Sequence, residues 1–243
     1  MKRKNVICAV LSNAAIIILI GILFFVCSPV PTAVSANAPV YNGDRESGCV
    51  ALMFNVYERS DNVEKILSIL SSERVTATFF VGGVWAEKNA PLIRKMSEQV
   101  ELGNHGYLHA DHAKLSENRN KEEIMLCHNL VEKLCGIRMN LFAPPSGAYG
   151  DACLKVCRDN RYQVVMWSKD TIDWRDKDAE LITKRAVSGV QSGDLILMHP
   201  TDRTVDALPK IIKVIKDKNL NLVTVSEALG LDKTDFSSAC ALI

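Results

Sequence analysis

The sequence VALMFNVYERSDNVEKILSILSSERVTATFFV, residues 50–81, places a helical pattern between two apolar runs. The first run, 50–55, is apolar up to Asn55 and predicts a buried strand. The last run, 76–81, is β-branched and aromatic, and predicts a second buried strand. Between them, Asp61 and Glu64 resemble a capping box at the start of a helix. One face of that helix is apolar at i, i+3, i+4 and i+7, with Val63, Ile66, Leu67 and Leu70.

The same alternation of strand and helix continues along the chain. Further strands are expected at 100–102, 141–143, 163–167, 195–198 and 222–225, and further helices at 91–99, 116–134, 151–160, 178–187 and 208–215. Six or seven repeats of strand then helix predict a parallel sheet with helices outside it. The residues alone leave two closures open, a doubly wound open sheet and a small barrel.

Charge composition excludes some partners. The chain has 29 Lys and Arg against 28 Asp and Glu, a net charge of +1, and the charges are spread out. No basic stripe interleaves with aromatic residues, so nucleic acid is not an expected partner.

The N-terminus has the order of an export signal. Lys2, Arg3 and Lys4 precede an apolar stretch at 6–27 and a small-residue site ending at Ala36. A cleaved signal peptide and an uncleaved membrane anchor both fit its length. Both place the basic residues inside and the domain outside the cytoplasm. We therefore expect the segment 1–36 to be followed by a linker at 37–47, a domain at 48–230 and a tail at 231–243.

Cysteine spacing argues against a structural zinc site. The chain has eight cysteines but no C-x-x-C pair. Cys127 falls in the apolar stripe of the expected helix 116–134 and is predicted to be a buried thiol.

Polar clusters follow the expected strands, at the carboxyl ends where parallel α/β folds place function. The clusters contain Asn55, His105 with His109, the stretch 144–149, Asp170 with Asp173 and Trp174, and His199. We expect all of them on one rim.

The residue types of this rim indicate hydrolytic or metal chemistry. His105 and His109 are candidate metal ligands, since two imidazoles with a carboxylate form an open zinc site. We expect Asn104 and Asp111 to fix their tautomers by hydrogen bonding. His199 is a candidate proton donor, because imidazole titrates near neutrality.

The ordered motifs resemble the polysaccharide deacetylases, that is, carbohydrate esterase family 4 or the NodB-homology domain. The resemblance covers roughly Gly48 to Leu229 and rests on five stretches: 53–57, 77–82, 103–105, 170–174 and 196–200. It implies a distorted barrel of parallel strands and a divalent metal, usually zinc. The reaction it implies is hydrolysis of N-acetyl groups on chitin- or peptidoglycan-like glycan. It also implies metal ligation by His105 and His109 and a general acid at His199. Asp173 matches the groove wall with Trp174 and is counted with His199 among the catalytic residues, and the substrate groove is expected to include Trp174, Pro145 and Tyr149.

Departures from the family pattern fall on its base and metal residues. The family wording T-F-D-D-G is Met53-Phe54-Asn55-Val56-Tyr57 here, so Asn55 replaces the base and Val56 the metal carboxylate. An amide cannot accept the proton, which removes general-base catalysis worth about 100- to 10,000-fold. Ala143 and Ser146 replace the arginine and tyrosine of R-P-P-Y-G. The Asn-Val pair is similar to that of a degenerate subgroup found in endospore-forming bacteria.

Two functions stay open at this stage. One is a metal-dependent N-deacetylase of cell-wall glycan with altered ligands, for which Glu58 is the candidate replacement carboxylate. The other is a degenerate deacetylase that binds N-acetylated glycan or a partner, in the cell envelope or the spore, without turnover.

Overall fold

A computed structural model of the chain describes residues 38–231. The predicted signal segment and the predicted tail beyond Leu231 lie outside these residues. The strands are β1 (Cys49–Val56), β2 (Thr78–Val81), β3 (Glu101–Asn104), β4 (Leu141–Phe142), β5 (Gln163–Val164), β6 (Lys169–Asp170), β7 (Leu195–Met198) and β8 (Asn221–Val223). The helices are α2 (Ser60–Glu73), α3 (Gly83–Lys88), α4 (Ala90–Ser97), α5 (Glu117–Cys135), the 3₁₀ turn η1 (Pro145–Gly147), α6 (Asp151–Asp159), α7 (Ala179–Val187), α8 (Asp202–Asp217) and α9 (Val225–Ala228).

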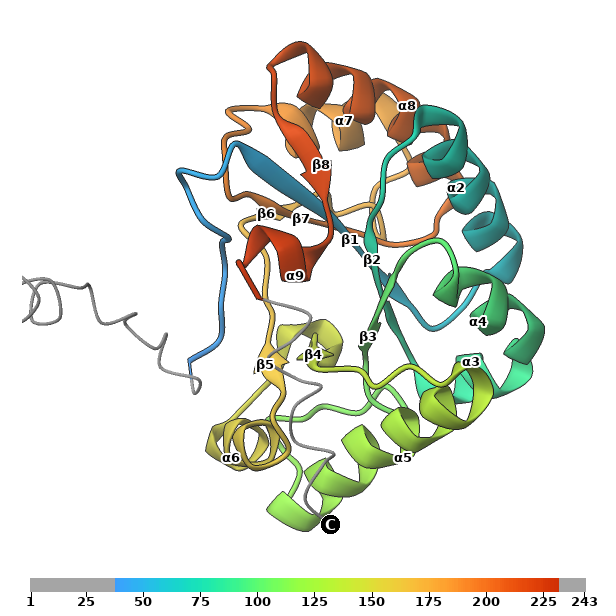
Figure 1. The fold of residues 1–243 in the computed structure, drawn as a ribbon, viewed down its shortest axis with the longest axis vertical. Coiled ribbons are helices and arrows are strands. Elements are labelled where there is room, and N and C mark those ends of the chain that lie inside the picture. Colours follow the sequence, from blue (N-terminus) through green and yellow to red (C-terminus); the bar gives the residue numbers. More distant parts are fainter. Residues whose placement is uncertain (1–37, 232–243) are drawn as a thin grey trace, which may run out of the picture. The chain divides into compact units, whose positions relative to one another are not determined.

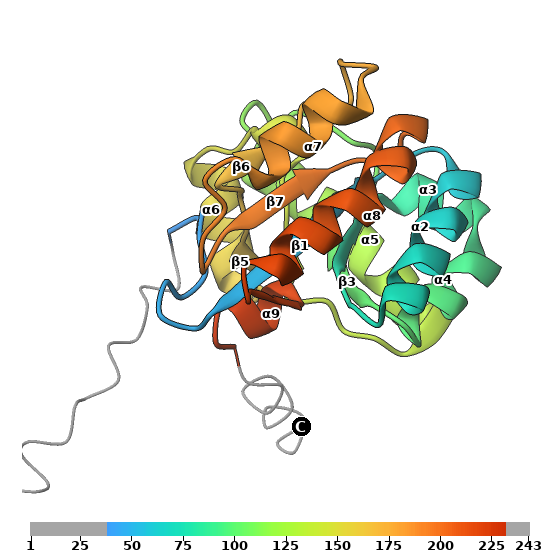
Figure 2. The same cartoon turned by 90° about the horizontal axis from the view of Figure 1, so that it is seen from above.

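The strands form one parallel sheet in the order β5-β4-β3-β2-β1-β7-β6, and β8 also pairs with β1. Helices α2, α4, α5 and α8 lie along the outer side of the curved sheet (Figure 1). Seen from above, α8 runs beside α7 over β7 (Figure 2). The distorted barrel of parallel strands that the sequence predicts is therefore confirmed.

Strand β1 separates two apolar clusters. Its side chains at 50, 52, 54 and 56 belong to the outer cluster, which the surrounding helices share. Ala51 and Met53 belong to the inner cluster, which α9 closes through Val225 and Ala228. Successive strand residues alternate faces, so Asn55 continues the inner face at the carboxyl end of β1. This alternation places Asn55 at the floor of the candidate site.

Some expected elements differ in the structure. The strand expected at 163–167 is shortened to β5, with Val165 in an isolated bridge, and the two-residue strand β6, which pairs with β7, was not predicted. The short helices α3 and α9 were not predicted. The capping box at Asp61 is wrong, because α2 begins at Ser60 after Arg59 in a left-handed conformation and has no side-chain cap.

Residues 40–45, here called the strap, cross from one end of the sheet to the other. Val40 forms a parallel bridge with Val165, next to β5, and Asn42 an antiparallel bridge with Asp194, next to β7. Arg45 pairs with Asp194 at 2.8 Å. A Cβ on Gly43 would lie 2.2 Å from the carbonyl oxygen of Ala228, so only glycine fits there. The segment expected as a linker thus packs on the domain.

The buried thiol predicted at Cys127 is confirmed, since Cys127 is fully buried and donates to the carbonyl of Val81 at 3.2 Å. Within residues 38–231 no helix combines the length and the hydrophobicity of a membrane span.

Candidate functional site

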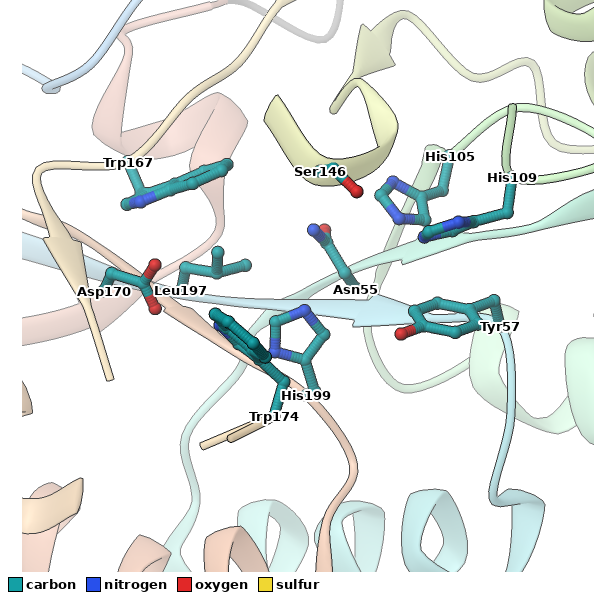
Figure 3. Close-up of a pocket in the computed structure, with 10 residues that line it drawn as sticks. All are labelled: Asn55, Tyr57, His105, His109, Ser146, Trp167, Asp170, Trp174, Leu197 and His199. Atoms are coloured by element: carbon teal, nitrogen blue, oxygen red, sulfur yellow. The ribbon is translucent and has the colours of Figure 1, made fainter. Parts of the chain in front are cut away.

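A pocket of about 290 Å³ opens at the carboxyl ends of the strands. Figure 3 shows its side chains converging from both halves of the sheet around Asn55. Its lining consists of Asn55, Tyr57, His105, His109, Ser146, Trp167, Asp170, Trp174, Leu197 and His199. The sequence prediction that polar clusters from separate strands share one rim agrees with this arrangement.

The two imidazoles come from the loop after β3. The rings of His105 and His109 are 5.1 Å apart between centroids and nearly perpendicular. Nδ1 of His105 donates to the carbonyl of Ala143 at 2.7 Å, which leaves Nε2 with its lone pair. Burial, with His109 nearby, lowers the pKa of His105 to about 3, so this ring is neutral.

Helix α5 anchors this loop through Glu123. The buried Glu123 carboxylate accepts from the backbone N–H of Tyr107 at 3.0 Å and of Leu108 at 2.7 Å. The sequence-based roles of Asn104 and Asp111 are wrong. Asn104 donates to the carbonyl of Ile124 and to Tyr162. Asp111 pairs with Lys114 at 2.8 Å, because both lie on the surface beyond the rings.

The floor of the pocket has lost its charge. Asn55 is 3% exposed, and its Oδ1 has no hydrogen-bond partner. Val56 is 0% exposed and packs in the outer apolar cluster. Ala143 is fully buried and offers no charged group where the family wording has arginine. A buried acceptor without a donor costs about 1–3 kcal/mol, which makes Asn55 an unusual residue to keep for stability.

On the opposite side, His199 is held firmly by Asp173. His199 donates to Asp173 through its backbone N–H at 2.6 Å and through Nδ1 at 2.8 Å. Thr204, on α8, donates to the same carboxylate at 2.6 Å. Asp173 is buried, and its two carboxyl oxygens accept all three of these bonds. The geometry makes Asp173 the residue that orients His199.

Aromatic side chains form the walls. Trp174 is 59% exposed at the rim, and Trp167 lies across the pocket from it (Figure 3). Ile172, two residues before Trp174, is a β-branched residue with a positive φ of 55°. Backbone strain of this kind concentrates at functional loops. The predicted groove residues Pro145 and Tyr149 do not line the pocket. Pro145 is buried, and the Tyr149 hydroxyl lies 2.8 Å from that of Tyr41.

The donor set does not fit a catalytic zinc ion. Such a site takes three protein ligands and keeps one open position. His105 and His109 provide two, and Val56 cannot provide a third. No group of three or more His, Cys, Asp or Glu in the part of the chain that the structure describes is arranged to hold a metal ion. Glu58, the candidate replacement, does not line the pocket.

Sequence reasoning missed three contributions to the site. Tyr57 enters the lining from the end of β1, while Glu123 and Thr204 fix the loop of His105 and the carboxylate of Asp173. Only Tyr57 left a signal in the sequence, as a bulky residue where the family wording has glycine.

Comparisons with known proteins agree with this geometry. The family profile described as polysaccharide deacetylase matches residues 42–165. The uncharacterised Bacillus subtilis protein YlxY is 37% identical over 192 residues, 79% of this chain and 60% of YlxY. A Bacillus cereus peptidoglycan-N-acetylglucosamine deacetylase is 31% identical over 206 residues, 82% of this chain and 75% of that protein.

Among solved structures, the Bacillus anthracis protein BA3943 is a pseudoenzyme of carbohydrate esterase family 4. It is similar to this chain with a TM-score of 0.78 and 30% identity, covering 80% of this chain and 70% of BA3943. The family match, the deacetylase relatives and the barrel with its rim histidines lead to one conclusion: this chain belongs to the polysaccharide deacetylase family.

Proposed function

We propose that this protein binds N-acetylated cell-wall glycan in the rim pocket and has lost the deacetylase activity of its relatives. The observation that carries the proposal is the asymmetry of the site. The acid side, His199 with Asp173, keeps its full set of hydrogen bonds. The base and metal side has a neutral amide at Asn55 and a buried valine at Val56.

Ligand chemistry supports glycan binding. Trp167, Trp174 and Tyr57 offer flat apolar faces beside hydrogen-bonding groups, a combination that suits sugar rings. The Bacillus cereus relative is named for its action on N-acetylglucosamine in peptidoglycan. The setting we propose is the outer cell envelope or the spore, with export through the N-terminal segment. Membrane attachment follows if that segment is not cleaved.

Metal content and turnover, measured on one sample, test the proposal. The purified protein should retain much less than one zinc per chain after dialysis, since two histidines without a carboxylate hold zinc weakly. It should bind N-acetylchitotetraose in calorimetry and release no acetate from it. The proposal would be overturned if the wild type held one zinc per chain tightly and released acetate at an enzyme-like rate, and if His105→Ala lost both properties.

Restoring the two carboxylates probes the same asymmetry. Asn55→Asp with Val56→Asp should produce measurable acetate release, and each single change should produce little, because the two carboxylates act as a unit. Ala143 limits the gain, since it lacks the guanidinium that supports the base in the family pattern. A mutant of the pseudoenzyme BA3943 has restored enzymatic activity, which makes such a repair feasible in this fold. Wild-type turnover that falls on Glu58→Ala would instead identify Glu58 as the replacement carboxylate.

A further inference from the structure

Tyr57 places an aromatic ring against the histidine pair. Its ring centroid lies 4.1 Å from that of His109 and 6.2 Å from that of His105. Figure 3 shows the ring beside His109, with its hydroxyl directed toward the centre of the pocket. The side chain is 39% exposed, so one part packs and another faces the pocket. In the family wording this position is a glycine, which leaves such a space free.

Two of the groups that share the pocket with Tyr57, His105 and Asn55, can pair with an uncharged ligand. His105 is neutral and presents the lone pair of Nε2, because Nδ1 donates to Ala143. Asn55 supplies a carboxamide at the floor, and its Oδ1 has no partner within the protein. An amide donor and an imidazole acceptor match the C=O and N–H of a secondary amide.

We propose that Tyr57 takes the place of the metal ion in ligand binding. The pocket then holds the neutral N-acetyl group of an amino sugar without metal. Asn55 and His105 hydrogen-bond the amide, and the Tyr57 ring packs against the acetyl methyl group. This inference rests on the glycan binding proposed above and adds the contact that makes it independent of metal. It concerns binding only and includes no chemical step.

Glycan affinity is the first arm of the test. Calorimetry compares N-acetylchitotetraose with fully deacetylated chitotetraose, each in EDTA and in zinc chloride. The wild type should prefer the acetylated ligand equally in both solutions. Tyr57→Gly should weaken that binding about tenfold or more, which corresponds to about 1.4 kcal/mol. Leu126→Ala, which shortens an exposed apolar side chain on α5 outside the pocket, should bind like the wild type.

Tyr57→Phe and Tyr57→Leu extend this arm. Phenylalanine keeps the ring without the hydroxyl and should retain most of the affinity. Leucine keeps apolar volume without the flat ring, so Tyr57→Leu should lose the affinity. The same variant replaces Tyr57→Gly in the test if the glycine variant fails to fold. Unchanged affinity in a folded glycine or leucine variant, or wild-type binding that requires zinc, would overturn the role of Tyr57 and leave glycan binding standing. No glycan binding by the wild type would instead overturn the proposed function.

Zinc affinity is the second arm and needs no glycan. In the family pattern position 56 carries the metal carboxylate. Val56→Asp restores that carboxylate next to Tyr57 in the chain, and Val56→Asp with Tyr57→Gly restores it with the ring removed. If Tyr57 occupies the place of the metal, the double variant should bind zinc about tenfold or more tightly than Val56→Asp. Equal zinc affinities would show that the ring does not stand in the metal position.

Discussion

Asp173 accepts three hydrogen bonds, from the His199 backbone, the His199 ring and Thr204. In Asp173→Asn, one of these donors faces an NH₂ group in a buried place. We expect a loss of about 3 kcal/mol, or about 6–12 °C in melting temperature for a domain of this size. Asp170→Asn is the matched control, because Asp170 accepts only the N–H of Ile172. Calorimetry measures the loss of stability in both variants. Equal losses would contradict the conclusion that the hydrogen bonds to Asp173 hold His199 in place.

Val56 also permits a test at a single residue. Its side chain is fully buried among apolar neighbours, so Val56→Asp should lower the melting temperature in EDTA. Zinc should recover part of the loss, because a ligand that binds only the folded state stabilises it, and Tyr57 limits that binding by standing in the metal position. Val50→Asp, in the same cluster at the far end of β1, should lose stability with no recovery. Equal recovery in both variants would mean that zinc acts elsewhere.

Part of the site could be predicted from residue order alone. His105, His109, Asn55 and His199 follow apolar runs, and the carboxyl ends of parallel strands meet at one edge. The partners of these residues could not be predicted in that way. Which carbonyl receives the His105 proton, and which carboxylate orients His199, depends on how loops far apart in sequence fold over the rim.

At the scale of elements, the strap depends on a close backbone approach. A Cβ at Gly43 would overlap the carbonyl of Ala228 on α9. Gly43→Ala should therefore cost about 1–3 kcal/mol, as expected for overpacking. Glu46→Ala, at an exposed position directly after the strap, should leave the denaturation midpoint unchanged. A Gly43→Ala midpoint equal to that of the wild type would show that the strap contributes nothing to stability.

Periodicity predicted the long elements and failed for the short ones. Helices α2, α5 and α8 carry apolar positions over three or more turns, so their sequence pattern is unambiguous. Strands β5 and β6 have two residues each, too few to show alternation. Their pairing with β4 and β7 is set by the folded sheet, which is why β5 was predicted too long and β6 was not predicted.

At the scale of the whole molecule, export is the testable prediction. Lys2, Arg3 and Lys4 ahead of an apolar stretch should stay inside while the domain crosses the membrane. A reporter that works only outside the cytoplasm should be active when it is fused after Leu229. The same fusion without residues 2–36 should be silent. Activity of a reporter that works only in the cytoplasm would reverse the proposed topology.

The strap has a mechanical consequence for a domain tethered through the residues that precede it. A pulling force that enters at Ala38 meets Val40 and Gly43 before it reaches β1. Val40 is bonded to the β5 side, where it accepts from Met166 at 2.7 Å, and Gly43 to the β7 side, where it donates to Gly193 at 2.8 Å. The load is therefore divided between the two ends of the sheet, and the strand that carries Asn55 is relieved of tension.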